Sequence, residues 1–465
     1  MKRTMTLVPE QLAGIHHHTV AILEKAGIDL RHAKACERLK KKGFKTDGTK
    51  VYISEHQLME AIRSTPGSFT ITSPTSGKQI EIGGDYFVMT STSGASSVMD
   101  IQGNRRPATQ SDYLDFLRLN HTSDVLELVS PLIVYPTDIP ADQFHVEMMT
   151  HALTMTDKPC GALAVSPEGT RQSIEILACC CGSRETLKSD YHSVFNINVL
   201  SPLGFSPDEV ESLMEIARAN QPTNITNMAM AGATAPIRTE DAVVMGNAEI
   251  LGGLVLAQAF QPGLPVIYGS TSSAVDMTTL SAVLGSPETL QIQRCMIDLA
   301  NYYGLACRTG GSLTDAHLPD GRAMSESALT LENAICHGAH VIIHACGMMS
   351  SYMAAGFEKW IMDEEVCRVV TRSVSPLDFR TVDPATIITI GSRGSYLTHP
   401  DTFRRCRSVF RSPWKKTLSH EKWLAGGGRT MAWEAKAAVR ERLSSYERPD
   451  FGPGLEKDLS KRMKK

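Results

Sequence analysis

Three stretches of the chain decide its fold: VIYGSTSSAVDM at residues 266–277, LACRTGGSLTDAHLPD at 305–320 and HVIIHACGMMSSYMAAGFEKWIMDEE at 340–365. Each begins with strand-forming residues, which are followed by a loop that contains Gly, Ser, Thr, Asp, His or Tyr. Helical segments separate one stretch from the next. This order is typical of successive turns of a β/α barrel, in which the loops that follow the strands build the active site. The polar residues of these loops are therefore candidates for function.

Strand-like and helix-like segments alternate over most of the chain. Seven strands are predicted, at residues 128–135, 160–165, 194–200, 225–230, 266–268, 306–309 and 341–344. Helix starts are marked by SPEGT at Ser166, SPDEV at Ser206, RTEDA near Thr239 and SPETL at Ser286, each with a Ser or Thr N-cap before acidic residues. The alternation predicts an α/β fold of the (β/α)8 TIM-barrel type, with an eighth strand at either 87–90 or 387–390.

The two ends of the chain differ from this pattern. Residues 10–25 have helical apolar spacing, and residues 69–88 look like short strands separated by turns. We therefore expect an N-terminal α+β cap over residues 1–120 and a β/α barrel over 121–400. Residues 401–465 are basic and helical in pattern, which predicts a peripheral C-terminal extension.

Composition excludes several classes of protein. The net charge is −3, and no Arg-rich stripe with interleaved aromatics occurs, which disfavours nucleic-acid binding. The N-terminus lacks a continuous apolar signal segment and no run of eighteen apolar residues occurs, so we expect a cytoplasmic protein without a membrane span. Eleven cysteines lack CxxC spacing, and Cys179, Cys180 and Cys181 diverge on one predicted helix, so neither a disulfide framework nor a bound metal is expected.

Five segments in a fixed order carry a resemblance to a known family. They are YGSTSSAVDM, SPETL, GGSLTDAHLPD, SESALTLENAICHGAHVIIH and HACGMMSSYMAAGFEK, with VMDIQGNRRPAT (98–109) and SPLIVYPTDIP (130–140) before them. In this order the chain resembles the trimethylamine methyltransferase family of corrinoid-dependent methyltransferases over most of its length.

The resemblance implies a barrel enzyme that transfers a methyl group from a methylated amine to the Co(I) of a separate corrinoid protein. The corrinoid protein would dock over the mouth of the barrel. No cofactor would then be held permanently by this chain. Family members that demethylate trimethylamine carry pyrrolysine in a barrel loop, whereas this sequence contains only the standard twenty residues. This departure favours the glycine betaine branch of the family, whose quaternary donors already have a neutral amine as leaving group.

Aromatic side chains near strand ends are candidates for enclosing a quaternary cation. They are Tyr268, Phe195, Tyr352, Phe357 and Trp360, of which Tyr268 and Phe357 are preferred. The competing interpretation of each is ordinary packing in the core or between helices.

Three residues are candidates for catalysis. His344 ends the strand VIIH beside the small residues Ala345 and Gly347, although a lone histidine after an apolar run is often a core residue. Asp315 lies in a Gly-rich loop after a strand, where a solvated loop is an equally good interpretation. Glu358 is assigned to the barrel mouth by family match, against the alternative of an exposed acid at a helix start.

Other polar residues at strand ends are candidates for binding substrate. His317 shares the Asp315 loop with Asp320, and Glu326 lies nearer the next helix start than Glu332. Arg308 is a candidate for binding a substrate carboxylate, provided that its position on the strand faces the barrel interior. Asn198 follows a strand in the same way, and Asp138 has weaker support.

Two other functions remain open. One is a β/α-barrel lyase or hydrolase that uses Asp315 and His317 as acid and base without a corrinoid protein, and the other is a non-catalytic betaine-binding protein. The apolar segment AEILGGLVLAQAF (248–260) suggests at least a dimer, with a wholly buried barrel helix as the alternative.

Overall fold

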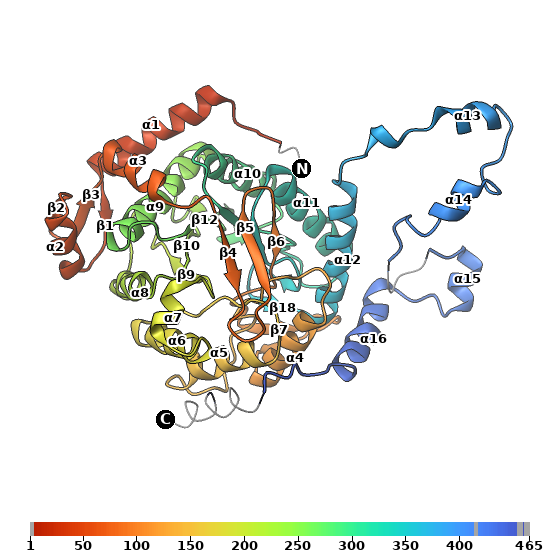
Figure 1. Cartoon of the computed structure of the whole chain (residues 1–465), viewed down its shortest axis with the longest axis horizontal. Coiled ribbons are helices and arrows are strands. Elements are labelled where there is room, and N and C mark those ends of the chain that lie inside the picture. The colour runs from red at the N-terminus through yellow and green to blue at the C-terminus, as the bar shows by residue number, and fades with distance from the viewer. Residues whose placement is uncertain (1–3, 413–416, 453–458, 460–465) are drawn as a thin grey trace.

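The computed structural model describes residues 4–412, 417–452 and 459. Parallel strands form its centre and helices surround them, as Figure 1 shows. Six strands pair in the order β6-β16-β15-β12-β10-β9, and every pair is parallel. Their bounds are β6 Val88–Met89, β9 Phe195–Asn198, β10 Thr223–Asn227, β12 Val266–Ser270, β15 Cys307–Gly310 and β16 Val341–Ile343.

Two further segments close these strands into a ring. Parallel bridges join Thr90 to Leu128, Val129 to Cys160 and Ala162 to Phe195. The described residues therefore form an eight-stranded parallel barrel, which confirms the (β/α)8 prediction. The segments at 128–135 and 160–165 contribute isolated bridges instead of the regular strands that we predicted.

The eighth strand is β6, at the first of the two predicted places. Residues 387–390 instead belong to helix α13 (Pro384–Ile390), so a strand there is wrong. Pro384 at the first helical position and the Asp383 side chain, which caps Ala385 N, explain why a helix begins at this point. The first barrel strand thus lies inside the segment expected as the N-terminal cap, and the divisions at residues 120 and 400 stay predictions.

The four predicted helix starts each coincide with the start of a barrel helix. Ser166, Ser206 and Ser286 each accept a hydrogen bond from the backbone N–H three residues later, which confirms three predicted N-caps. Helix α9 begins at Thr239 with Arg238 as its N-cap and no side-chain cap, so the fourth predicted cap is wrong. The helices around the barrel are α4 Gln110–His121, α5 Phe144–Thr154, α6 Pro167–Cys180, α7 Arg184–Ser189, α8 Pro207–Arg218, α9 Thr239–Phe260, α10 Pro287–Tyr302, α11 Gly321–His337 and α12 Phe357–Ser373.

Helix α9 contains the segment that suggested a dimer. It is long and apolar enough to cross a membrane by length and composition, but 83% of its apolar window is buried inside the protein. It packs between the barrel and the N-terminal helices α1 (Pro9–Lys25) and α3 (Glu55–Ser64). The apolar composition of α9 is therefore explained by the barrel core.

The amino-terminal end of the barrel is closed by a hairpin of β4 (Ser68–Thr72) and β5 (Gln79–Gly83). Phe69, Ile71 and Ile82 of the hairpin pack on residues at the starts of barrel strands, such as Ile267 and Val341. Only the carboxyl-terminal end is left for a ligand. A second N-terminal unit contains α2 (Ala33–Lys41) and the antiparallel sheet of β1 (Ile28–Asp29), β3 (Lys50–Tyr52) and β2 (Lys45–Asp47).

Small sheets built from the loops cover the carboxyl-terminal end. One contains β17 Met348–Met349, β18 Ala354–Ala355, β7 Ser97–Met99 and β8 Arg105–Pro107, and the other contains β11 Met230–Ala231, β13 Ser273–Asp276 and β14 Ser281–Val283. The pairing of β18 with β7 joins the loop after β16 to the loop after β6. These sheets fix the loops that surround the barrel mouth.

Candidate active site

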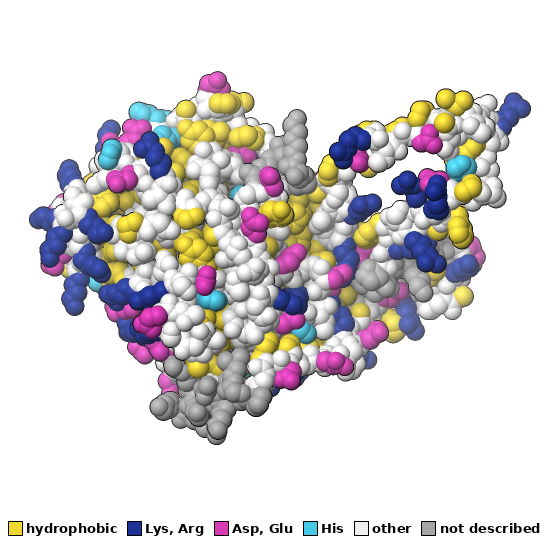
Figure 2. All heavy atoms as spheres, viewed as in Figure 1, with side chains coloured by type: hydrophobic (Ala, Val, Ile, Leu, Met, Phe, Trp, Pro, Cys, Tyr) yellow, Lys and Arg dark blue, Asp and Glu magenta, His cyan; other side chains and the backbone are white. Residues whose placement is uncertain are grey.

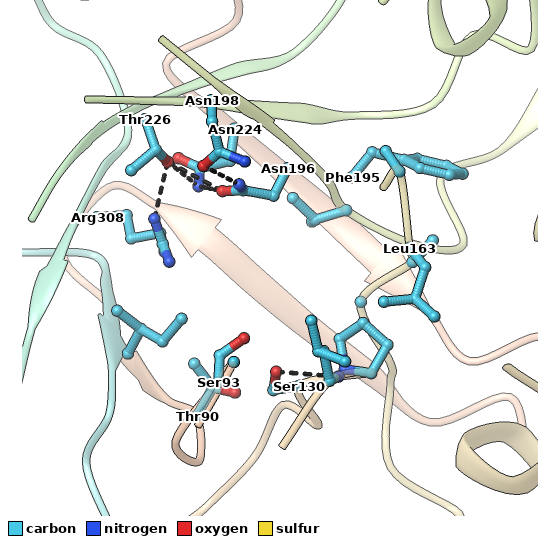
Figure 3. Close-up of a pocket in the computed structure, with 18 of the residues that line it drawn as sticks. Thr90, Ser93, Ser130, Leu163, Phe195, Asn196, Asn198, Asn224, Thr226 and Arg308 are labelled. Carbon is cyan, nitrogen blue, oxygen red and sulfur yellow. Dashed lines mark hydrogen bonds between the residues drawn. The ribbon is translucent and has the colours of Figure 1, made fainter. Parts of the chain in front are cut away.

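A cavity of about 440 Å³ runs from the barrel interior to the carboxyl-terminal ends of the strands, a size typical of small-ligand sites. Figure 3 shows that its polar side chains come from opposite walls. Its polar lining consists of Thr90, Ser93, Ser130, Asn196, Asn198, Glu209, Asn224, Thr226, Thr271, Arg308, His344 and Tyr352. Small residues such as Gly94, Gly161 and Ala162 leave room for the ligand.

Arg308 is the cation in this lining. Its Nη1 donates to Thr226 Oγ1 at 2.7 Å, and the Asn224 amide, with its oxygen turned toward the guanidinium, accepts from Nη1 at 3.0 Å. Burial lowers the pKa of Arg308 to about 10. Among the described residues, no carboxylate forms an ion pair with it. A guanidinium in a cavity wall, without a counter-ion among the described residues, is a strong attractor for an anionic ligand.

Hydrogen bonds connect this cation to an acid. Thr226 Oγ1 donates to Asn196 Oδ1 at 2.9 Å, and Asn196 Nδ2 donates to Asn198 Oδ1 at 2.8 Å. Asn198 Nδ2 then donates to Glu209 Oε1 at 3.3 Å. The network therefore crosses from β15 through β10 and β9 to the first turn of α8.

The surroundings of the Glu209 carboxyl group disfavour its ionised form. Burial raises its pKa to about 7, and its Oε2 has no hydrogen-bond partner within the part of the chain that the structure describes. An acid with one unpaired buried oxygen beside a cavity is suited to a cationic ligand, which would favour the ionised form.

Strand alternation explains which side chains reach the cavity. A Cβ on Gly269 would lie 2.4 Å from the end of the Asn224 side-chain amide and 2.6 Å from Thr226 Oγ1, so position 269 faces the interior. Tyr268 therefore points outward, where its hydroxyl donates to Asn247 Oδ1 of α9 at 2.8 Å. Tyr268, one of the two preferred aromatics, lies in the core outside the cavity.

His344 lies at the mouth with a neutral ring. Its Nδ1 accepts from Ser93 N at 3.2 Å, which assigns the proton to Nε2. Burial and the charge of Arg308 lower the pKa of His344 to about 3. Its backbone has φ of 60°, in the left-handed region that a non-glycine residue rarely adopts.

Tyr352 lies beside His344, with ring centroids 5.1 Å apart, and also lines the cavity. Phe195 borders the cavity, but its ring points away from Asn196 and Arg308 in Figure 3. Tyr352 is therefore the aromatic side chain best placed to meet a ligand. Of the predicted site residues, the structure brings Arg308, Asn198, His344, Tyr352 and Phe195 together.

Asp315, His317 and Glu326 lie outside the cavity lining and connect loops. Asp315 accepts from Leu284 N at 3.0 Å, Gly285 N at 3.1 Å and Ser351 Oγ at 2.6 Å. Glu326 accepts from Thr314 Oγ1 at 2.6 Å, and His317 Nδ1 lies 2.8 Å from Ser350 Oγ. Together they tie the loops after β14, β15 and β16 to one another.

The candidates on α12 also lie outside the cavity lining. Phe357 stacks on Phe116 of α4, with centroids 4.1 Å apart, and buried Trp360 donates to Glu364 Oε1 at 3.1 Å. Burial raises the pKa of Glu358. Among the weaker candidates, Asp138 accepts from Gln110 N at 2.8 Å and Asp320 caps α11. Glu332 is exposed on α11.

Sequence reasoning missed Glu209, Asn196, Asn224 and Thr226. The available signal was the i, i+2 spacing of Asn196 with Asn198 and of Asn224 with Thr226, which places both members of a pair on one face of a strand. Glu209 was assigned only to the helix-start motif SPDEV, although the first turn of a helix after a barrel strand lies at the mouth.

No metal centre was found among the described residues, where no three His, Cys, Asp or Glu side chains form a possible ligand group. The polar part of the cavity lining is instead made of amides, hydroxyls, one guanidinium, one carboxyl and one neutral imidazole. Such a set can hold a molecule that carries both charges.

Comparisons with known proteins bear on the family and the fold. The family model described as trimethylamine methyltransferase (MTTB) matches residues 1–465. A glycine betaine methyltransferase of Desulfitobacterium hafniense is 31% identical over 97% of this chain and 95% of its own. A proline betaine:corrinoid methyltransferase of Eubacterium limosum is 28% identical over 94% of this chain and 92% of its own. The crystal structure of Methanosarcina barkeri monomethylamine methyltransferase aligns with a TM-score of 0.55 and 11% identity, covering 96% of this chain and 90% of that one, which supports the fold.

Proposed function

The chain belongs to the trimethylamine methyltransferase family and is a corrinoid-dependent methyltransferase of quaternary amines, and we propose that its donor is a small betaine held between Arg308 and Glu209. The observation that carries the donor assignment is the Arg308 guanidinium in the cavity wall, which has no carboxylate partner among the described residues. A betaine contains a carboxylate and a permanent cation in one small molecule, which complements this lining.

Arg308 would bind the carboxylate, since its fork of N–H donors matches two oxygens. Thr226 and Asn224 hold the guanidinium from one side and so fix its orientation. Glu209 and the Tyr352 ring would attract the methylated ammonium group through charge and cation–π contact. Both ends of the donor are then held, and one methyl group is aimed at the mouth.

The contribution of the chain to the reaction is orientation and desolvation. A quaternary ammonium leaves as a neutral amine, so no side chain has to donate a proton to the leaving group. The corrinoid of the partner supplies the nucleophilic Co(I) that accepts the methyl group. The side chains act earlier, by removing water from the cation and restricting its rotation.

His344 would keep the donor facing the mouth. Its neutral ring supplies an Nε2–H without adding a second positive charge beside Arg308 and the ammonium group. Asp315, His317 and Glu326 would support the loops around the corrinoid, and Glu358, Phe357 and Tyr268 would act through packing.

A corrinoid protein is the proposed partner, docked over the carboxyl-terminal end of the barrel. The β4–β5 hairpin closes the opposite end, so this is the end from which a large cofactor can approach the cavity. We propose that the chain holds no cofactor of its own between turnovers. The cytoplasm is the proposed compartment, in keeping with eleven free cysteines.

The test is incubation of the protein with a reduced corrinoid protein and a panel of glycine betaine, proline betaine, carnitine, choline and tetramethylammonium. We expect betaine-dependent conversion of Co(I) to methyl-Co(III) in the absorption spectrum, with choline and tetramethylammonium much poorer donors. Equal rates with choline would contradict the role of Arg308. Substrate turnover without any corrinoid protein would instead support a lyase or hydrolase, and binding without methyl transfer a betaine-binding protein.

A further inference from the structure

The loop after β16 has an unusual backbone. Between residues 344 and 352, four residues other than glycine have positive φ: His344 60°, Ser350 53°, Ser351 51° and Tyr352 73°. Such residues rarely adopt this left-handed region, and they stay in it only where surrounding contacts hold them. Two of the four, His344 and Tyr352, line the cavity. The contacts that hold this loop therefore decide where two side chains of the site lie.

A buried ion pair lies behind the loop. Lys359 and Asp363 are one turn apart on α12, and both side chains are 0% exposed. Charged side chains usually lie on the surface, as the Lys, Arg, Asp and Glu side chains on the face in Figure 2 do. Lys359 Nζ bonds Asp363 Oδ1 and also donates to Ser327 Oγ of α11 at 2.8 Å. The pair thus joins two barrel helices inside the protein.

The second oxygen of Asp363 reaches the loop. Asp363 Oδ2 accepts a hydrogen bond from Gly347 N at 2.8 Å. Gly347 lies between His344 and the three consecutive left-handed residues, and its own φ is 93°. A Cβ on Gly347 would lie 3.0 Å from Trp360 Cε3, so the backbone of the loop runs close against α12. The loop is therefore linked to the helix at its middle.

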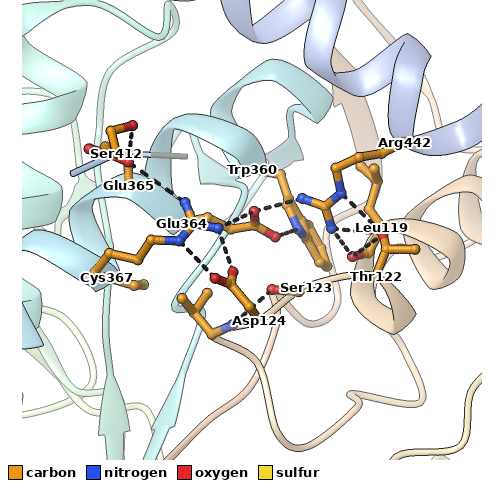
Figure 4. Close-up of polar contacts among 12 residues, drawn as sticks. Leu119, Thr122, Ser123, Asp124, Trp360, Glu364, Glu365, Cys367, Ser412 and Arg442 are labelled. Atoms are coloured by element: carbon orange, nitrogen blue, oxygen red, sulfur yellow. Dashed lines mark hydrogen bonds and ion pairs between the residues drawn. The ribbon is translucent and has the colours of Figure 1, made fainter. Parts of the chain in front are cut away.

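Helix α12 is a firm support for this link. Trp360 Nε1 donates to Glu364 Oε1 at 3.1 Å, within the helix. Arg442 of α16 (Met431–Ser444) donates to Glu364 Oε2 at 2.6 Å and to Thr122 Oγ1 beside α4, as Figure 4 shows. Helix α12 is packed against α4, α11 and α16. A side chain on α12 can hold the loop because its own helix is fixed.

Stability alone does not explain the ion pair. The cost of removing two charges from water is comparable to the gain from their attraction, so a buried ion pair is often no more stable than apolar residues of similar size. An apolar residue at position 363 would, however, leave Gly347 N without its acceptor. What the pair contributes is a hydrogen bond of fixed direction to the backbone of the loop.

We propose that Lys359 and Asp363 are positioning residues for methyl transfer. Asp363, held by Lys359, fixes Gly347 and with it the left-handed loop. His344 and Tyr352 are then in place in the cavity before the donor binds. This inference rests on the proposed function, since the donor is the molecule that the two side chains would meet.

Two double variants separate the hydrogen bond from the charges. Lys359→Met with Asp363→Asn removes both charges and keeps an oxygen for Gly347 N, whereas Lys359→Met with Asp363→Leu removes that oxygen as well. With the best donor of the betaine panel, the Asn variant should stay within about three-fold of the wild-type KM. The Leu variant should have a KM about ten-fold higher or more and a kcat near wild type, because only a fraction of its molecules has the loop in place.

Val370→Ala is the control for general damage. Val370 is buried further along α12, so its truncation opens a cavity and lowers the midpoint of denaturant unfolding. We expect KM to stay at its wild-type value in this variant. A KM that rose in Val370→Ala as much as in the Leu variant would show that loss of stability, and not the bond to Gly347, affects the site.

A fluorine signal reports on Tyr352 itself. In protein labelled with fluorotyrosine, comparison with Tyr352→Phe identifies the resonance of Tyr352. We expect a single line in the wild type, the Asn variant and Val370→Ala. In the Leu variant the line should broaden or split, and betaine should restore it. A merely structural role of the ion pair would lower the unfolding midpoint of the Leu variant without changing this resonance.

Hydrogen exchange tests the wild type directly and does not depend on whether a variant folds. We expect the amides of residues 345–352 to be protected in the absence of donor, as those of α12 are, because the loop is held before binding. Rapid exchange in the free protein, with protection only after betaine is added, would overturn the proposal.

The kinetic outcomes distinguish this inference from the proposed function. With an active wild type, a Leu variant of wild-type KM would overturn the role of the ion pair alone. So would an Asn variant as impaired as the Leu variant. Absence of methyl transfer from every betaine in the wild type would instead overturn the proposed donor, and this inference with it.

Discussion

The Arg308 guanidinium on β15 reaches Thr226 on β10, two strands away, where Nη1 donates to Oγ1 at 2.7 Å. The intervening strand β12 presents Gly269 at this point, and a Cβ there would lie 2.6 Å from Thr226 Oγ1. The absence of a side chain on Gly269 is what allows the contact across β12.

Gly269→Ala should therefore displace the polar cluster. We expect the KM for betaine to rise by ten-fold or more, because Thr226 and Asn224 have to move and Arg308 loses its fixed orientation. Steady-state kinetics with the corrinoid protein measures this. Gly14→Ala is the control, since a Cβ at Gly14 meets nothing within 4 Å and should stabilise helix α1 by about 0.5–1 kcal/mol.

Arg308→Leu should remove betaine binding while leaving the fold intact. Loss of a charged hydrogen-bonding partner for the carboxylate costs about 2–5 kcal/mol, which corresponds to a fall in kcat/KM of roughly 30- to 5000-fold. Stability should stay the same or rise, because a charge without an ion-pair partner among the described residues is removed from the cavity wall.

Two comparisons separate this effect from general damage. Arg308→Lys should recover part of the activity, because the charge returns without the fork. Transfer from choline, which has no carboxylate, should change much less than transfer from betaine. Arg294→Leu on α10, outside the cavity lining, should leave both donors unaffected.

The barrel was predictable because its signals are local. Apolar runs such as VIIH and the N-caps Ser166, Ser206 and Ser286 are contained in a few neighbouring residues. The alternative strand at 387–390 has an apolar run too, but Pro384 and the Asp383 cap make it a helix. An apolar run therefore predicts the right kind of element only when the helix-start residues before it are considered as well.

The site was only partly predictable, because it depends on which face of a strand points inward. Arg308 and Tyr268 both lie on apolar strands, yet one faces the cavity and the other faces α9. A shift of one residue reverses that assignment, and barrel curvature fixes it only in three dimensions. Asp315 had the composition of a site residue, but its oxygens are used by backbone N–H groups of another loop.

Glu209 predicts a pH dependence of substrate binding. Since burial raises its pKa to about 7, the group is protonated below that pH and loses its attraction for the ammonium end. We expect the KM for betaine to increase as pH falls from 8 to 6 in the wild type. Glu209→Gln should have a higher KM and lose this dependence, whereas Glu211→Gln on the same helix, where the carboxylate pairs with Arg171 of α6, should keep the wild-type profile.

The ionised Glu209 carboxylate should lower the free energy of unfolding. Its folded pKa lies above its ordinary value of 4.5, so the folded protein binds more protons than the unfolded chain between about pH 4.5 and 7, and stability falls as pH rises through that window. Glu209→Gln should therefore be more stable at pH 8, by on the order of 1–3 kcal/mol. Denaturant unfolding at pH 5 and pH 8 measures the difference, and equal effects at both pH values would argue against a buried ionised group.

His344 combines a left-handed backbone with a buried acceptor for Ser93 N. His344→Ala leaves that N–H unpaired, which costs about 1–3 kcal/mol, and should also lower methyl transfer by ten-fold or more. His344→Asn keeps an acceptor and tolerates the left-handed conformation, so its stability should approach the wild type while its activity stays low. Equal loss of stability and activity in both variants would identify a core histidine.

Asp315 offers the sharpest distinction between supporting a loop and reacting with substrate. It joins the loop after β14 to Ser351, next to Tyr352, through three accepted hydrogen bonds. In Asp315→Asn the side-chain NH2 group replaces one of the two accepting oxygens and cannot accept a hydrogen bond. The link to Ser351 should therefore weaken, and Tyr352 should lose its fixed position. We expect the KM to rise about ten-fold while the shape of the pH–kcat profile stays unchanged. Loss of one limb of that profile would instead show that Asp315 is an acid or base. Asp320→Asn in the same loop is the matched control, because Asn caps α11 as well as Asp does and should leave both quantities at their wild-type values.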